Sequence, residues 1–173
     1  MKILIVGLPG TVKKTFSKIL KEKYGFQSIS DWDIFAENNI KTNAKENKIA
    51  ISSQYSKILL NKINALPDNF VVDLEYSISP NDFVQYNTDK SLKIVYLGFI
   101  SLENNTLFNL FRKNKANKNY SDSQLMSQIE FYKQISKQYK QQCNQHNISF
   151  FDINKDRQEA INDILKHLNL NHD

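Results

Sequence analysis

A glycine-rich turn near the N-terminus constrains the fold of this chain more than any other feature. The turn reads Gly7-Leu8-Pro9-Gly10-Thr11-Val12-Lys13-Lys14-Thr15. It follows the contiguous apolar segment Lys2–Val6, whose β-branched residues predict a buried strand, and it precedes apolar residues at helical spacing up to Tyr24. A strand, a glycine turn and a helix in this order predict an α/β domain with a parallel sheet.

The same alternation continues along the chain. Further apolar segments predict strands at 26–29, 69–74, 92–99 and 148–151, and longer amphipathic segments between them predict helices. Polar residues 30–48 predict only a short helix after Asp33 and a mobile segment over Thr42–Lys48. Ser101 with Asn104, then Ser121 and Asp156, are expected to begin the last three long helices. We therefore predict one domain over residues 1–173, a three-layer α/β fold with a five-stranded parallel sheet and helices on both faces.

The composition limits which binding partners and which cellular compartment we expect for this chain. Two of the 23 basic residues are arginines, Arg112 and Arg157, and the lysines are dispersed along the chain. Dispersed lysine favours a solvated surface over a nucleic-acid-binding face, although the net charge is +5. No apolar run approaches the ~18–20 residues of a membrane span, and the N-terminus lacks a signal-peptide pattern. Cys143 is the single cysteine, so the chain has no intrachain disulfide, as suits a reducing compartment. These features predict a cytoplasmic protein with no membrane partner.

The glycine-rich turn also matches most of the phosphate-binding pattern G-x-x-x-x-G-K-[ST]. In such a loop, backbone N–H groups converge on phosphate oxygens, the lysine reaches the β and γ phosphates, and the hydroxyl after it holds Mg²⁺. Gly7 takes the first position, Lys13 takes the lysine position, and Gly10 is an additional glycine. We therefore predict that the whole turn, from Gly7 to Thr15, binds ATP.

Two positions depart from this pattern. Val12 replaces the second glycine, which is costly if that residue needs a positive φ. Lys14 replaces the hydroxyl, and an ammonium group cannot ligate a cation. Thr15, one residue later, is then a candidate for binding Mg²⁺. Asp73, near the end of the third predicted strand, is either a further site residue, because the carboxyl ends of strands line the ligand crevice, or only the polar end of that strand. The pattern thus predicts ATP more firmly than it predicts Mg²⁺.

Residues 7–20 resemble the start of the adenylate kinase and nucleoside monophosphate kinase family, and the resemblance extends more weakly over most of the chain. Val71-Val72-Asp73 resembles the third strand of that family, which implies that Asp73 helps to organise Mg²⁺. Leu107–Tyr132 resembles the helix, short lid and second helix of the family. The resemblance implies a P-loop kinase fold that transfers a phosphoryl group from ATP to a small acceptor. It implies Lys13 and Asp73 as catalytic residues and a basic lid that contains Arg112, Lys113 and Lys118.

Neither the candidate acceptor-binding residues nor the small number of arginines determines whether the chain is an active enzyme. Asp31 and Asp33 are candidates for orienting an acceptor, while Asp33 fits equally well as a helix cap. The family clamps phosphates with arginines, but here other residues stand at the matching positions, namely Ala36, Ser77, Asn109 and Gln128. The sequence is therefore consistent with an ATP-dependent phosphotransferase or with a non-catalytic relative that senses nucleotides or binds a protein. A nucleic-acid-associated P-loop protein is a third and less favoured hypothesis.

Overall fold

The computed structural model describes residues 1–30, 33–34, 53–75, 78–114, 117–153 and 156–170. The strands of these residues are β1 (Lys2–Gly7), β2 (Gln27–Ser30), β3 (Phe70–Glu75), β4 (Leu92–Gly98) and β5 (Ser149–Asp152). The helices are α1 (Lys13–Tyr24), α3 (Ser53–Ala65), α4 (Pro80–Tyr86), α5 (Asn104–Arg112), α6 (Asp122–His146) and α7 (Arg157–His167). None of the described helices combines the length and the apolarity that crossing a bilayer requires.

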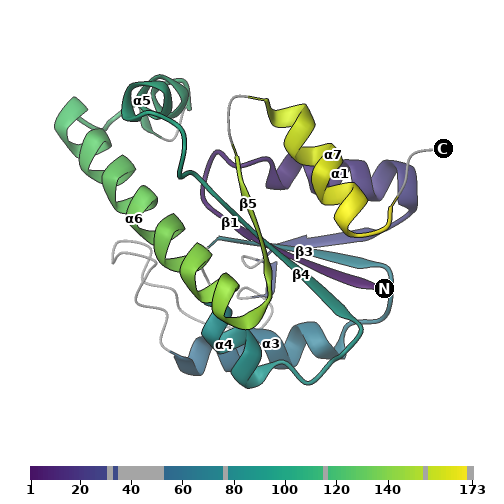
Figure 1. Ribbon diagram of the computed structural model, residues 1–173. Coiled ribbons are helices and arrows are strands. Elements are labelled where there is room, and N and C mark those ends of the chain that lie inside the picture. Colours follow the sequence, from purple (N-terminus) through teal and green to yellow (C-terminus); the bar gives the residue numbers. More distant parts are fainter. Residues whose placement is uncertain (31–32, 35–52, 76–77, 115–116, 154–155, 171–173) are drawn as a thin grey trace.

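The five strands form one parallel sheet in the order β2-β3-β1-β4-β5. Helices α1 and α7 cover one face of this sheet, and α3 and α4 cover the other (Figure 1). The predicted three-layer α/β fold is thereby confirmed. β1 leads into α1 on one face, whereas its neighbour β3 leads towards α4 on the opposite face. In open parallel sheets, such a divergence at the carboxyl ends of adjacent strands creates the crevice where ligands bind.

Two hydrophobic clusters fill the space on either side of the sheet. Alternate residues of β1 face opposite clusters, as the two-residue period of a strand requires: Ile3 and Ile5 face one, and Leu4 and Val6 the other. The first cluster includes residues of α1, α5 and α7, and the second includes residues of α3 and α4. α6 contributes to both clusters, through residues such as Tyr132 in its first half and Cys143 near its end.

Of the three helix starts predicted from capping residues, those of α6 and α7 are confirmed. Ser121 and Gln124 form a reciprocal capping box at α6, and the Asp156 carboxylate accepts two backbone N–H bonds at α7. α5 instead begins at Asn104, with Glu103 as its N-cap residue. The amides of Ile100 and Ser101, before this helix, donate to the Asp152 carboxylate at 2.7 and 3.0 Å. The mobile segment predicted over Thr42–Lys48 lies outside the described residues.

An ion pair between buried Lys2 and half-buried Asp89 holds the start of β1, at the opposite end of the sheet from the glycine-rich turn. Lys2 Nζ donates to the backbone oxygen of Asn64 at 2.7 Å and lies 2.5 Å from Asp89 Oδ2. The hydrogen bond from Lys2, followed by bonds from Ser91, lowers the pKa of Asp89 from 3.8 to about 2. The folded state therefore favours the ionised carboxylate.

This ion pair predicts a defined loss of stability in acid. The pKa of Asp89 is lower in the folded than in the unfolded chain, so its stabilising effect is complete above about pH 4 and is lost as the pH falls towards 2. Urea unfolding between pH 5 and pH 2 is expected to show a shallower pH dependence for Asp89→Asn than for the original chain. Equal slopes for the two proteins over this range would contradict the assignment.

Candidate functional site

The glycine-rich loop (Gly7–Thr15) connects the carboxyl end of β1 to the first turn of α1. The amide and the hydroxyl of Thr11 both donate to the backbone oxygen of Leu8, at 3.2 and 2.7 Å, and these bonds close the turn. Gly10 has a φ of +82°, and a Cβ atom there would lie 3.1 Å from Cε1 of Phe111 in α5. Glycine is therefore required at position 10 both by the backbone and by the close approach of α5.

Replacing Gly10 with alanine is expected to destabilise the protein more than the same change at Gly25. Gly25 has a similar φ of +71°, but a Cβ atom added there would have no neighbour within 4 Å. Gly25→Ala therefore measures only the free-energy cost of placing an alanine at a positive φ, about 1–2 kcal/mol. Gly10→Ala adds the displacement of Phe111. Urea unfolding of the two variants measures the difference, and an equal loss in both would show that Phe111 does not press on the loop.

Gly7 has a structural reason to be glycine that is independent of any ligand. A Cβ atom at this residue would lie 2.8 Å from the Cβ of Leu97 on the adjacent strand β4. Real Cβ atoms do not approach each other so closely, so a larger residue would push β4 away. The first glycine of the loop is thus explained by strand packing, and evidence for a phosphate site has to come from the other loop residues.

Val12 fits the loop without backbone strain. Its φ and ψ are −73° and 8°, so the position does not need the left-handed region, and the penalty considered for a β-branched residue does not arise. The side chain is 3% exposed and packs in the first hydrophobic cluster, together with Leu8 and Phe16. Valine at this position anchors the loop to the core.

Lys13 is the charged side chain that lies inside the loop. It is 5% exposed, and its Nζ donates to the backbone oxygen of Gly7 at 2.5 Å. The side chain therefore folds back from the start of α1 to the first residue of the loop, which brings a buried ammonium group next to the N-terminus of a 12-residue helix. Both features favour an anion at this point.

Lys14 and Thr15 follow Lys13 on the first turn of α1, and both are exposed. Their side chains are accessible to a ligand over the loop without any rearrangement of the core. Exposure of Lys14 also means that its ammonium group remains hydrated, so it does not disturb the buried part of the loop.

Two carboxylates of β3 lie beside the loop. In the register of the sheet, Asp73 pairs with Ile5 and Glu75 pairs with Gly7. Both are half-buried, and the two-residue strand period places them on the same face as Val71, which packs in the cluster that contains α1. β3 extends one residue beyond its predicted end and includes Glu75, for which the sequence predicts no role. Because Glu75 pairs with Gly7, its carboxylate lies nearer to the glycine-rich loop than that of Asp73.

Asp73 and Glu75 do not form a complete metal site by themselves. Among the described residues, no group of three or more His, Cys, Asp or Glu side chains is arranged to hold a metal ion. Mg²⁺ is commonly bound by one or two carboxylates together with water and phosphate oxygens of a substrate. Asp73, Glu75 and the Thr15 hydroxyl are oxygen donors of the kind that such a site uses.

Asp33 lies three residues after the end of β2, and its carboxylate is hydrogen-bonded to Ser30. The amide and hydroxyl of Ser30 donate to Asp33 Oδ2 at 2.9 and 2.7 Å, and the Asp33 amide donates back to the Ser30 hydroxyl at 3.3 Å. These bonds lower the pKa of Asp33. Ser30 pairs with Asp73 in the sheet, so this turn lies at the same carboxyl edge as the loop. Asp31, the other candidate acceptor residue, lies outside the described residues.

Arg112, expected in a lid, is bonded within the segment that joins α5 to α6. Its Nη1 donates to the backbone oxygen of Tyr120 at 2.8 Å, its Nη2 pairs with the Asp122 carboxylate, and its guanidinium lies 5.2 Å from the ring centroid of Phe108. Lys113 and Lys118 in the same segment are exposed. The arginine therefore fixes this segment, while the two lysines are available to an anion.

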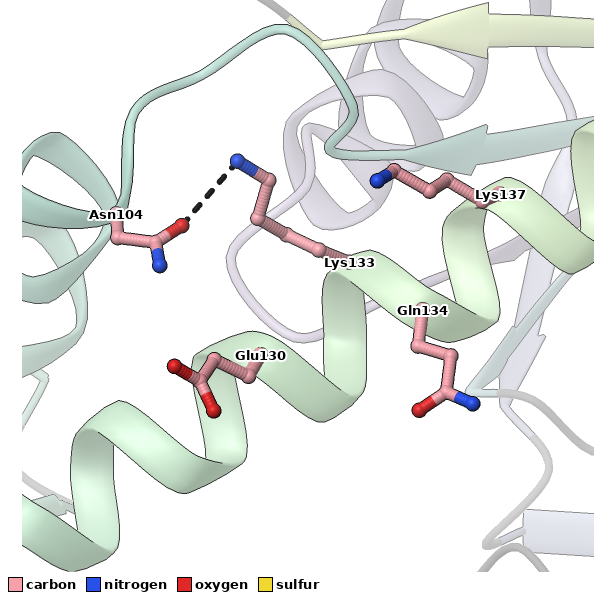
Figure 2. A pocket seen from close by; sticks show the side chains of 5 residues that line it. All are labelled: Asn104, Glu130, Lys133, Gln134 and Lys137. Atoms are coloured by element: carbon pink, nitrogen blue, oxygen red, sulfur yellow. Dashed lines mark hydrogen bonds between the residues drawn. The ribbon is translucent and has the colours of Figure 1, made fainter.

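A groove of about 330 Å³ lies between the start of α5 and the middle of α6, lined by Asn104, Glu130, Lys133, Gln134 and Lys137 (Figure 2). Lys133 Nζ donates across it to the backbone oxygen of Leu102 at 2.7 Å and to Asn104 Oδ1 at 3.2 Å. This lysine ties the two helices together. None of the residues predicted for the site lines the groove.

Comparison with known proteins relates both the sequence and the fold to kinases. No family model matches the chain. The chain is 39% identical over 74 residues to an adenylate kinase of Lachnospira eligens, covering 43% of this chain and 32% of that protein. It is 34% identical over 84 residues to an adenylate kinase of Borrelia turicatae, covering 42% and 40%. The matches therefore span less than half the length of these relatives.

The solved structures that share the fold cover nearly the whole chain. A shikimate kinase from Bacteroides thetaiotaomicron aligns with a TM-score of 0.66 at 16% identity, over 98% of this chain and 99% of that one. A gluconokinase from Sinorhizobium meliloti aligns with a TM-score of 0.51 at 11% identity, over 97% and 95%. With the local adenylate kinase matches, these likenesses establish a P-loop kinase-like fold for this chain.

Proposed function

We propose that this chain binds ATP at the glycine-rich loop and transfers its terminal phosphoryl group to a small acceptor. The observation that carries the proposal is the buried Lys13 ammonium group, held 2.5 Å from Gly7 O at the N-terminus of α1. The local similarity to adenylate kinases and the fold shared with two kinases of small metabolites support it. A cytoplasmic location, where ATP is abundant, is part of the same proposal.

In the proposed mechanism, loop amides and the first turn of α1 bind the phosphates of ATP. Lys13 exchanges its bond to Gly7 O for a bond to a phosphate oxygen, so its charge is available where negative charge accumulates during transfer. Thr15, Asp73 and Glu75 would hold Mg²⁺, which neutralises phosphate charge when it is bound. The turn at Asp33 lies beside Asp73 and would orient the acceptor.

The arginine content predicts slow turnover. Phosphoryl-transfer enzymes depend on charge placed around the transferred group, and each missing contact costs on the order of 2–4 kcal/mol. Arg112 is engaged with Asp122 and Tyr120 rather than with the loop. The same engagement favours a second candidate function, nucleotide binding without catalysis, in which the protein acts as a sensor or binds a partner protein.

A transfer assay separates the two functions. The chain would be incubated with γ-³²P-labelled ATP and Mg²⁺ in the presence of nucleoside monophosphates, nucleosides, sugars or hydroxy acids, and labelled products would be separated by chromatography. Labelling of one acceptor that is lost in Lys13→Met supports the phosphotransferase. ATP binding in calorimetry without any transfer supports the non-catalytic function, and absence of both binding and transfer contradicts the two proposals together.

A further inference from the structure

The two arginines of the chain have different surroundings. Arg112 is held by Asp122, Tyr120 and Phe108 in the segment between α5 and α6. Arg157, the first residue of α7, is exposed, and its Nη2 donates to the backbone oxygen of Gly10 at 3.3 Å. This hydrogen bond joins residues 147 positions apart and brings a guanidinium group to the rim of the glycine-rich loop.

The fold holds Arg157 in this position through its own helix. Ala160 and Ile161, three and four residues later, are buried in the cluster that also contains Leu8 and Val12 of the loop. Residues at this spacing share a helix face, so Arg157 is directed to the same side as these two anchors. The preceding Asp156 accepts the amides of Gln158 and Glu159 at 2.9 Å, which fixes where α7 begins.

A guanidinium group has five N–H donors arranged in a planar fork, and one carbonyl oxygen uses only a small part of them. Phosphate oxygens accept paired bonds from such a fork. We infer that Arg157 binds the polyphosphate of the nucleotide from the rim of the glycine-rich loop. This inference rests on the proposed nucleotide site, and it assigns to α7 a phosphate-binding arginine that the lid segment does not supply.

Calorimetric titration tests the inference with two probes, ATP and inorganic tripolyphosphate, on the original chain and on Arg157→Ala, Arg157→Lys and Gln158→Ala. Arg157→Ala is expected to lower the affinity for both probes by about tenfold or more, as the loss of a charge-assisted hydrogen bond implies. Arg157→Lys keeps the charge without the fork and should recover only part of the affinity. Gln158→Ala, at the next exposed residue of the same helix, should bind as the original chain does.

The possible failures are distinguishable. If Arg157→Ala binds ATP as tightly as the original chain while Lys13→Met does not, the proposed function stands and the role of Arg157 is wrong. If Arg157→Ala loses ATP affinity but keeps tripolyphosphate affinity, the arginine contacts the nucleoside and not the phosphates, which also contradicts the inference. If the original chain binds neither probe, the proposed function and this inference both fail.

Discussion

Replacing Lys13 with methionine is expected to reduce phosphoryl transfer by about 10²–10³-fold and to weaken ATP binding markedly. Methionine retains an unbranched apolar stem in the buried channel that Lys13 occupies, but it removes the ammonium group that lies 2.5 Å from Gly7 O. Removing one hydrogen-bond donor from a place where negative charge develops in the transition state has an effect of this size in other enzymes. Transfer kinetics and calorimetry on the purified variant measure the two effects.

Lys18→Met is the matched control for this prediction. Lys18 lies on the same helix, is exposed, and forms a solvent-exposed ion pair with Glu22 at 3.7 Å. Such pairs contribute little to stability, so this variant should fold, bind and react as the original chain does. If Lys13→Met and Lys18→Met gave the same activity, the buried ammonium group would have no role in the chemistry.

Replacing Phe111 with alanine is expected to lower the free energy of unfolding by about 3–5 kcal/mol, the usual cost of truncating a buried phenylalanine. Phe111 is 2% exposed, and its ring packs edge-on against Phe99 and Tyr132, with centroid distances of 6.1 and 5.6 Å. It also lies against Gly10. The change therefore creates a cavity where α5, α6 and the glycine-rich loop meet, and urea unfolding measures the loss.

Phe131→Ala provides the comparison. Phe131 also contacts Tyr132, at a centroid distance of 6.1 Å, but it is only partly buried. Its truncation should therefore cost clearly less than that of Phe111. A similar decrease in the free energy of unfolding for the two variants would show that Phe111 is not packed more tightly than Phe131. The packing described where α5, α6 and the glycine-rich loop meet would then be wrong.

The layers of the fold could be predicted from sequence because each element carries its own periodicity. Contiguous apolar strands and amphipathic helices alternate along the chain, and local caps such as Ser121 with Gln124 mark helix starts. The start of α5 lies at Asn104, after Glu103, and not at Ser101 as predicted. The amides of Ile100 and Ser101 donate to the carboxylate of Asp152, about fifty residues later in the chain, and no local pattern indicates such a contact.

The candidate site could be predicted only where spacing along the chain determines it. The position of Lys13 after Gly7 follows from the phosphate-binding pattern. The φ of Val12 does not, because it depends on how the loop enters α1. The contact between Arg157 and Gly10 joins the two ends of the chain, and no periodicity or motif indicates it.

A crystal structure with a non-hydrolysable ATP analogue and Mg²⁺ tests the central claim most directly. We expect the phosphates to lie in the glycine-rich loop, with Lys13 Nζ on a phosphate oxygen instead of on Gly7 O. We also expect the Val12 backbone to keep its present conformation. An analogue bound elsewhere, or absent at saturating concentration while Lys13 still contacts Gly7 O, would contradict the claim that this loop binds nucleotide.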